Sequence, residues 1–175
     1  MTPRKPRPPL TADTLRDLAL HYVGRFATSR GKLRAYLDRK LRERGWDGEE
    51  GPEVDALVDR MAELGYVDDA GFAAMKSAAM TRRGYGARRV GEALRGAGIA
   101  EDDRAAAEAQ MADGRWEAAD RFARRKRIGP YAAGPADPAL RQKWIAAFLR
   151  AGHDVAMARR WADAAPGDVP EREDA

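Results

Sequence analysis

Cysteine is absent from this 175-residue sequence, and histidine occurs only twice, at His21 and His153. The absence of cysteine excludes disulfides, thiolate zinc sites and cysteine nucleophiles, and it fits a reducing compartment. Two isolated histidines without cysteines make a poor metal site, so each is better explained by a packing or surface role. The sequence therefore predicts no metal and no cofactor.

Long apolar runs are missing as well. No stretch approaches the roughly 20 apolar residues that span a bilayer, and the basic, proline-rich residues 1–10 lack the apolar segment that follows them in a secretory signal. These absences predict a cytoplasmic protein that does not contact a membrane. Runs of alternating Val, Ile, Thr and Tyr are also absent, which leaves all-α as the expected fold class.

Catalytic motifs are equally scarce. The sequence has no phosphate-binding Gly-x-x-x-x-Gly-Lys-Ser/Thr loop and no His-Glu-x-x-His metal motif. Residues 84–89 begin like a dinucleotide fingerprint, but Arg89 replaces the third glycine and no strand precedes it. The neighbouring Asp68 and Asp69 are better explained as helix N-caps than as a catalytic pair. We therefore expect a protein that is not an enzyme.

What the sequence does contain is helical periodicity. Leu15, Leu18, Tyr22 and Phe26 fall on one face of a helix that begins near Thr11. Similar apolar stripes, bounded by capping residues and glycines, predict eight more helices. They fall within residues 29–45 and 52–65, from Asp68 or Asp69 through Met80, over Val90 and Leu94 to Gly98, from Asp102 or Asp103 through Met111, from near Trp116 over Phe122, within 137–152, and from Asp154 through Trp161.

The glycines that end three of these helices suggest an internal repeat. Gly45, Gly98 and Gly152 are 53 and 54 residues apart, and each follows apolar residues four and eight positions earlier. This spacing predicts three tandem three-helix repeats over residues 11–67, 68–114 and 115–165. Because units this small cannot bury their own cores, we expect them to stack into an elongated, curved array. A disordered basic arm over 1–10 and a disordered acidic tail over 166–175 would flank them.

Basic residues cluster in the first unit, between Arg25 and Arg44, and in two further segments that we single out as functional candidates. One surrounds Tyr85, and the other places five positive charges in seven residues. Because we expect no nearby acids to balance them, they predict a surface for phosphates or for an acidic protein groove, to which arginine makes forked contacts. A solvated helix face is the alternative interpretation. The predicted binding residues are Arg82, Arg83, Tyr85, Arg88 and Arg89, with Arg121, Arg124, Arg125, Lys126 and Arg127.

Three motifs resemble those of the RecX regulatory proteins. Ser29 and Arg30 before a helix with Leu37, Leu41 and Gly45 are similar to the family's first unit. So is Leu-Gly-Tyr-Val-Asp-Asp at 64–69, followed by Phe72 and Ala73, which is the family's most recognisable segment. Gly86, Leu94 and Gly98 complete the similarity to the family's second unit. The resemblance covers nearly all of residues 13–163 and is weakest in the third unit.

The resemblance implies a regulator without enzymatic activity. Such proteins bind the RecA recombinase filament on single-stranded DNA and limit ATP turnover, strand exchange and the filament's role in the SOS response. It implies a monomer that contacts RecA and leaves direct contact with single- or double-stranded DNA open. The charged residues around Tyr85 and Arg124 would then line the contact face.

Other interpretations predict different behaviour. A helix-turn-helix-like DNA-binding protein would bind naked DNA strongly, in a salt-sensitive manner and without a recombinase. A general helical scaffold would retain a different protein partner.

Overall fold

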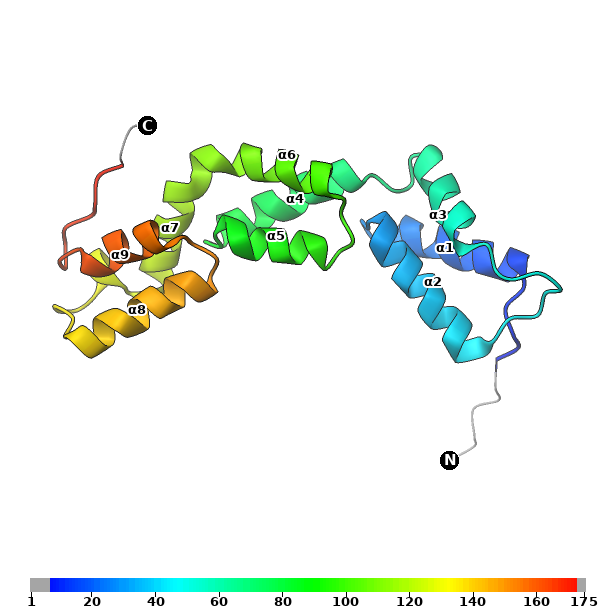
Figure 1. Ribbon diagram of the computed structural model, residues 1–175, viewed down its shortest axis with the longest axis horizontal. Helices are drawn as coiled ribbons and strands as arrows, with labels where there is room; N and C mark the ends of the chain where they lie inside the picture. The colour runs from blue at the N-terminus through cyan, green and yellow to red at the C-terminus, as the bar shows by residue number, and fades with distance from the viewer. Residues whose placement is uncertain (1–6, 173–175) are drawn as a thin grey trace, which may run out of the picture. The chain divides into compact units, whose positions relative to one another are not determined.

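The computed structural model describes residues 7–172, and the segments 1–6 and 173–175 lie outside the described residues. Between residues 7 and 172 the chain forms nine α-helices and two short 3-10 helices, with no strand. The predicted all-α fold class is thus confirmed. The helices are α1 (Ala12–Arg25), α2 (Arg30–Arg44), α3 (Val54–Glu63), α4 (Asp69–Arg82), α5 (Ala87–Arg95), α6 (Glu101–Met111), η1 (Ala112–Gly114), α7 (Arg115–Lys126), η2 (Gly129–Tyr131), α8 (Pro138–Arg150) and α9 (Val155–Asp163) (Figure 1).

The helices belong to two compact units. Of the described residues, 7–72 and 97–100 make unit 1, and 73–96 and 101–172 make unit 2. The three glycines of the sequence repeat all have a positive φ, with Gly45 at 79°, Gly98 at 71° and Gly152 at 93°. Glycine is favoured there because it has no Cβ to clash in this conformation. The three repeats and their curved array stay a prediction.

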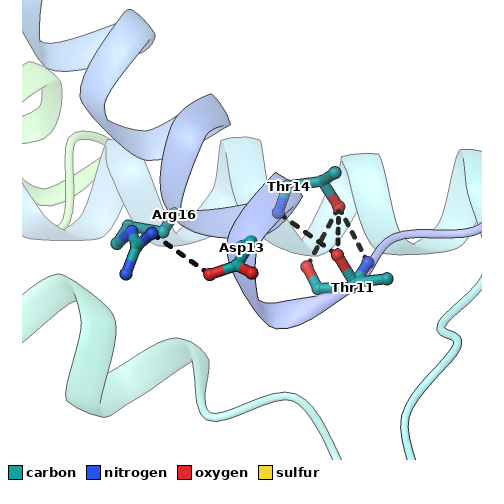
Figure 2. A network of polar contacts seen from close by, with 4 residues as sticks. All are labelled: Thr11, Asp13, Thr14 and Arg16. Carbon is teal, nitrogen blue, oxygen red and sulfur yellow. Dashed lines mark hydrogen bonds and ion pairs between the residues drawn. The ribbon is translucent and has the colours of Figure 1, made fainter.

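Unit 1 is built on α1, α2 and α3, which pack against one another. Its core includes Leu15, Leu33, Leu37 and Val58, all buried, with Leu41 packed at the edge. At the start of α1, the Thr11 side chain accepts from the Thr14 backbone N–H, and the Thr14 side chain hydrogen-bonds back to the Thr11 N–H (Figure 2). This capping box satisfies two backbone donors that a helix start would otherwise leave unpaired, so it fixes where α1 begins.

Leu10 corrects the predicted boundary of the disordered arm. The prediction ended the arm at residue 10, but the Leu10 side chain is fully buried in the core of unit 1. Its backbone forms a parallel bridge with Trp46, in which Leu10 N donates to Gly45 O and Asp47 N donates to Leu10 O. Burial of the apolar side chain and pairing of the backbone groups therefore keep Leu10 ordered, although it follows several prolines.

The two aspartates predicted as caps serve different helices. Asp68 precedes α4, and its Oδ1 accepts from Gly71 N at 2.9 Å, which is a cap as predicted. Asp69 Oδ1 instead accepts from Arg30 N at 2.8 Å, at the start of α2. Asp69 therefore pairs one of the orphan N–H groups of α2 and joins two of the family-like motifs within unit 1.

Ser29 connects α2 to the turn that contains Gly98. Its Oγ caps α2 by accepting from Lys32 N, and it donates to Ala97 O at 2.5 Å. The backbones then touch, because a Cβ added to Gly31 would lie 2.6 Å from the Gly98 Cα. The turn after α5 is thereby fixed against the start of α2 within unit 1.

Unit 2 repeats this arrangement at the next glycine. Gly86 N donates to Ala151 O at 2.9 Å, and Arg88 N donates to Gly152 O at 3.2 Å. Ala151 follows Ala97 by 54 residues, so its carbonyl lies at the corresponding position of the predicted repeat. The start of α5 thus meets the turn after α8, as the start of α2 meets the turn after α5.

The core of unit 2 is aromatic. Phe122, Phe148 and Trp161 are buried together with Ile128 and alanines from α7 and α9. His153 lies among them, where it contacts the Phe122 and Phe148 rings and its Nε2 hydrogen-bonds to Gly84 O at 3.1 Å. Burial lowers the pKa of His153, so the neutral ring is favoured there. This contact matches the packing role predicted for the histidine.

The end of the chain also differs from the prediction of a disordered tail. Gly167 N donates to Pro130 O at 2.9 Å, and Arg172 pairs with Glu117 at 3.1 Å. Residues 166–172 therefore contact unit 2, because their backbone and charged groups find partners on η2 and α7.

Candidate partner-binding surface

The turn between α4 and α5 lies directly against α7. Gly84 has a φ of 82°, and a Cβ there would lie 2.9 Å from Phe122 N. Only glycine gives the turn both this conformation and this close approach. The contact brings together, within unit 2, the two basic segments that are about 40 residues apart in the sequence.

Tyr85 lies at the centre of the combined surface. The guanidinium carbons of Arg83 and Arg125 each lie 5.7 Å from the centroid of its ring, and Arg125 also lies 5.5 Å from the Phe122 ring. Arg125 Nη1 donates to the Arg83 carbonyl oxygen. We call Arg83, Tyr85 and Arg125 the tyrosine–arginine cluster.

Aromatic rings and one backbone carbonyl hold the two guanidinium groups of the cluster in place. A cation beside an aromatic ring gains about 0.5–1 kcal/mol at an exposed site and keeps its full charge. In the part of the chain that the structure describes, neither Arg83 nor Arg125 has a carboxylate ion-pair partner. The cluster is therefore positioned in advance to contact carboxylate or phosphate groups.

Arg124 contradicts the expectation that no acid balances the α7 charges. Arg124 Nε donates to Asp120 Oδ2 at 3.0 Å, and its guanidinium lies 4.7 Å from the Tyr131 ring centroid. The Tyr131 hydroxyl donates to Asp120 Oδ1 at 2.5 Å. The hydrogen bond to Asp120 raises the pKa of Arg124. Burial, together with the hydrogen bond that its own hydroxyl donates to Asp120, raises the pKa of Tyr131. This network ties α7 to η2 and engages one of the predicted contact residues.

Arg88 and Arg89 are also paired, which corrects the same expectation for α5. Both contact Glu92, at 3.3 Å and 3.2 Å, and Arg88 Nη2 also donates to Leu149 O. These ion pairs are mostly exposed, so each contributes only about 0–1 kcal/mol to stability. A partner carboxylate could compete for such arginines at small cost.

The remaining predicted residues are exposed. Arg82 ends α4, Arg121 lies on α7, and Lys126 and Arg127 follow at its end. Arg127 has a φ of 53°, a left-handed conformation that ends α7 in place of the usual glycine. No ion pair involves these four side chains between residues 7 and 172.

Asp120 and Tyr131 are the residues that sequence reasoning missed. Asp120 precedes Arg124 by four positions on one helix, a spacing that could have signalled the ion pair. Tyr131 follows a proline-containing loop, and no local pattern indicates that its hydroxyl reaches back to α7. No cluster of three or more metal-ligating side chains occurs within residues 7–172, and no helix in that range is long and apolar enough to cross a membrane.

The fold and this surface define a class: all-helical proteins that present an arginine-rich surface. Comparison with curated proteins narrows the class. The chain is 30% identical over 172 residues to a regulatory protein RecX from Myxococcus xanthus, a match that covers 94% of this chain and 91% of the relative. It is 34% identical over 100 residues to a regulatory protein RecX from Mycobacteroides abscessus, which covers 57% and 48% of the two chains. No family model matches the chain.

Solved structures agree with this result at the level of the fold. The RecX crystal structure from Lactobacillus salivarius matches with a TM-score of 0.62 at 16% identity, over 84% of this chain and 91% of that chain. A second crystal structure of a regulatory protein RecX matches with a TM-score of 0.65 at 21% identity, over 87% and 71%. The chain belongs to the RecX family of regulatory proteins, and the predicted resemblance is confirmed.

Proposed function

We propose that this chain binds the filament that the RecA recombinase forms on single-stranded DNA and inhibits its ATPase, recombinase and co-protease activities. In this way it would modulate DNA repair and the SOS response, as a cytoplasmic monomer. Membership of a regulatory family supports the proposal. The tyrosine–arginine cluster is the observation that carries it, because this cluster unites the two basic segments.

The chemistry of the cluster suits a filament on DNA. Arginines held against a ring are already oriented, so less side-chain entropy is lost when they bind than for free arginines. Exposed Arg82, Arg121, Lys126 and Arg127 extend the positive charge on both segments. Such a surface attracts a negatively charged partner over several ångströms and weakens as salt screens it.

Charge reversal on α7 tests the proposal. The variant Arg125→Glu/Lys126→Glu/Arg127→Glu leaves Arg124 with Asp120, so it removes positive charge without breaking the network to Tyr131. We expect it to lose inhibition of the recombinase ATPase by about tenfold or more in effective concentration, since each lost contact to a charged group costs about 1–3 kcal/mol. Arg150→Glu is the matched control, since Arg150 is exposed on α8 of the same unit and outside the predicted surface.

The helix-turn-helix-like alternative predicts a different result. A protein that acts through naked DNA would bind duplex or single strands without recombinase, and the triple variant would lose that binding with a reduced salt dependence. A folded triple variant that still inhibits ATPase fully would contradict the assigned surface. Loss of inhibition only in parallel with loss of naked-DNA binding would favour the alternative.

A further inference from the structure

A pocket of about 380 Å³ opens beside the tyrosine–arginine cluster, entirely within unit 2. Its walls come from the turn before α5, the start of α7 and the junction of α8 with α9. This junction is where the backbones of Gly86 and Gly152 meet, so the walls belong to a closely packed part of the unit. The volume lies within the range of about 300–1,000 Å³ that is usual for binding pockets.

The lining is apolar inside and positively charged around it. Met111, Leu149, Val155 and Met157 supply apolar surface, and Arg88 and Arg115 supply positive charge. Methionine side chains adapt to the shape of an inserted group. Val155 is 49% exposed although it is a large aliphatic residue at the first position of α9. Val155 therefore extends the apolar lining of the pocket to the surface of unit 2.

The charged groups of the pocket favour a negative partner. Arg115 is exposed and has no ion pair among the contacts found in residues 7–172. Arg88 already holds Glu92 and the Leu149 carbonyl, which fixes its position at the wall. The one acid of the lining, Asp154, is engaged as the N-cap of α9, where its Oδ1 accepts from Met157 N at 2.7 Å. The positive charge of Arg115 is therefore not neutralised by an acid of the pocket lining.

We propose that this pocket receives a large apolar side chain from an acidic segment of the recombinase. The apolar residue would enter between Met111 and Met157, and flanking carboxylates would meet Arg115 and Arg88. Tyr85 and Arg88 belong to both the pocket and the predicted basic surface, so one partner segment can contact both. The inference rests on the proposed function and deepens it. In a filament of recombinase on DNA, this part of unit 2 would contact the recombinase and not the DNA.

Two variants with matched controls test the pocket. Val155→Trp fills its mouth and Arg115→Glu reverses its free charge, and both positions are exposed, so the fold should be retained. Leu140→Trp, at an exposed apolar position of α8 outside the pocket, controls for the added ring, and Arg150→Glu controls for the charge. We expect each test variant to bind preformed recombinase filaments about tenfold more weakly than the wild type, with both controls within about twofold.

A crosslink identifies the occupant directly. A photoreactive benzoyl-phenylalanine placed at position 155 should attach to a recombinase segment that carries several carboxylates around a large apolar residue. Attachment to the DNA or to a basic segment would overturn the inference. If the wild type binds filaments but Val155→Trp and Arg115→Glu bind equally well, the pocket assignment alone fails. If the wild type does not bind filaments, the proposed function is wrong, and so is the proposed occupant of the pocket.

Discussion

The backbone of Gly86 lies against that of Gly152 so closely that a Cβ at Gly86 would be 2.4 Å from the Gly152 carbonyl carbon. The contact positions α5 on the turn after α8 and sets both the cluster at Tyr85 and the pocket beside it. An atom at that distance cannot be accommodated without moving the backbone of one of the two segments.

Gly86→Ala should therefore destabilise unit 2. We expect a loss of about 1–3 kcal/mol or more in unfolding free energy, because overpacking against backbone cannot be relieved by a rotamer change. Thermal or denaturant unfolding measures it. Gly134→Ala is the control, since a Cβ there has nothing within 4 Å. Equal stability of both variants would contradict the close contact.

Tyr131→Phe tests the network that holds Arg124. The substitution removes the hydroxyl that donates to Asp120 and keeps the ring beside Arg124. Hydrogen bonds to charged groups contribute about 1.5–3 kcal/mol, so we expect a loss near the lower end for this half-buried pair. Denaturant unfolding is the measurement, and a variant as stable as the wild type would show that the hydroxyl contributes nothing to α7.

His153 should make stability depend on pH. Burial lowers the pKa of its ring in the folded protein below the ordinary value of 6.5, while the Gly84 carbonyl and Asp154 oppose the shift. The unfolded chain then binds more protons as pH falls, so the stabilisation from neutral His153 is complete above about pH 6.5 and decreases below it.

The melting temperature at pH 7.5 and pH 5.5 reports this dependence. His153→Gln should flatten the difference between the two pH values, whereas His21→Gln should leave it as in the wild type because His153 is still present. An unchanged difference in His153→Gln would show that other groups are responsible.

Tyr85→Ala and Tyr85→Phe separate the ring from the hydroxyl in binding. Loss of the ring frees Arg83 and Arg125, each of which gains about 0.5–1 kcal/mol from it. We expect Tyr85→Ala to weaken filament binding severalfold and Tyr85→Phe to bind like the wild type. If a folded Tyr85→Ala variant bound filaments as tightly as the wild type, the ring would have no role in binding.

Local sequence signals predicted most of the helices and the turns at Gly45, Gly98 and Gly152. Helical periodicity and capping depend on neighbours within a few residues, so they can be read directly from the sequence. The burial of Leu10 was missed because a single apolar residue after several prolines forms no periodic apolar pattern. Its place is set by Trp46, far along the chain.

The basic composition of the candidate surface can be predicted from the sequence, but its arrangement cannot. The sequence indicates which segments are basic, but the meeting of Arg83 and Arg125 at Tyr85 depends on how Gly84 packs on α7. Arg124 instead pairs with Asp120 on its own helix, whereas Arg125 reaches across to the Arg83 carbonyl and the Tyr85 ring. Asp69 likewise accepts from Arg30 N at the start of α2, a tertiary contact that no local pattern indicates.

The proposed function requires this chain to act on a recombinase filament. The most direct test adds the purified protein to preformed RecA filaments on single-stranded DNA and follows ATP hydrolysis. We expect hydrolysis to fall as protein is added, and Arg125→Glu/Lys126→Glu/Arg127→Glu to shift this inhibition to a protein concentration about tenfold higher or more. Hydrolysis that stays constant while the protein binds the filaments or the naked DNA would contradict the proposed function.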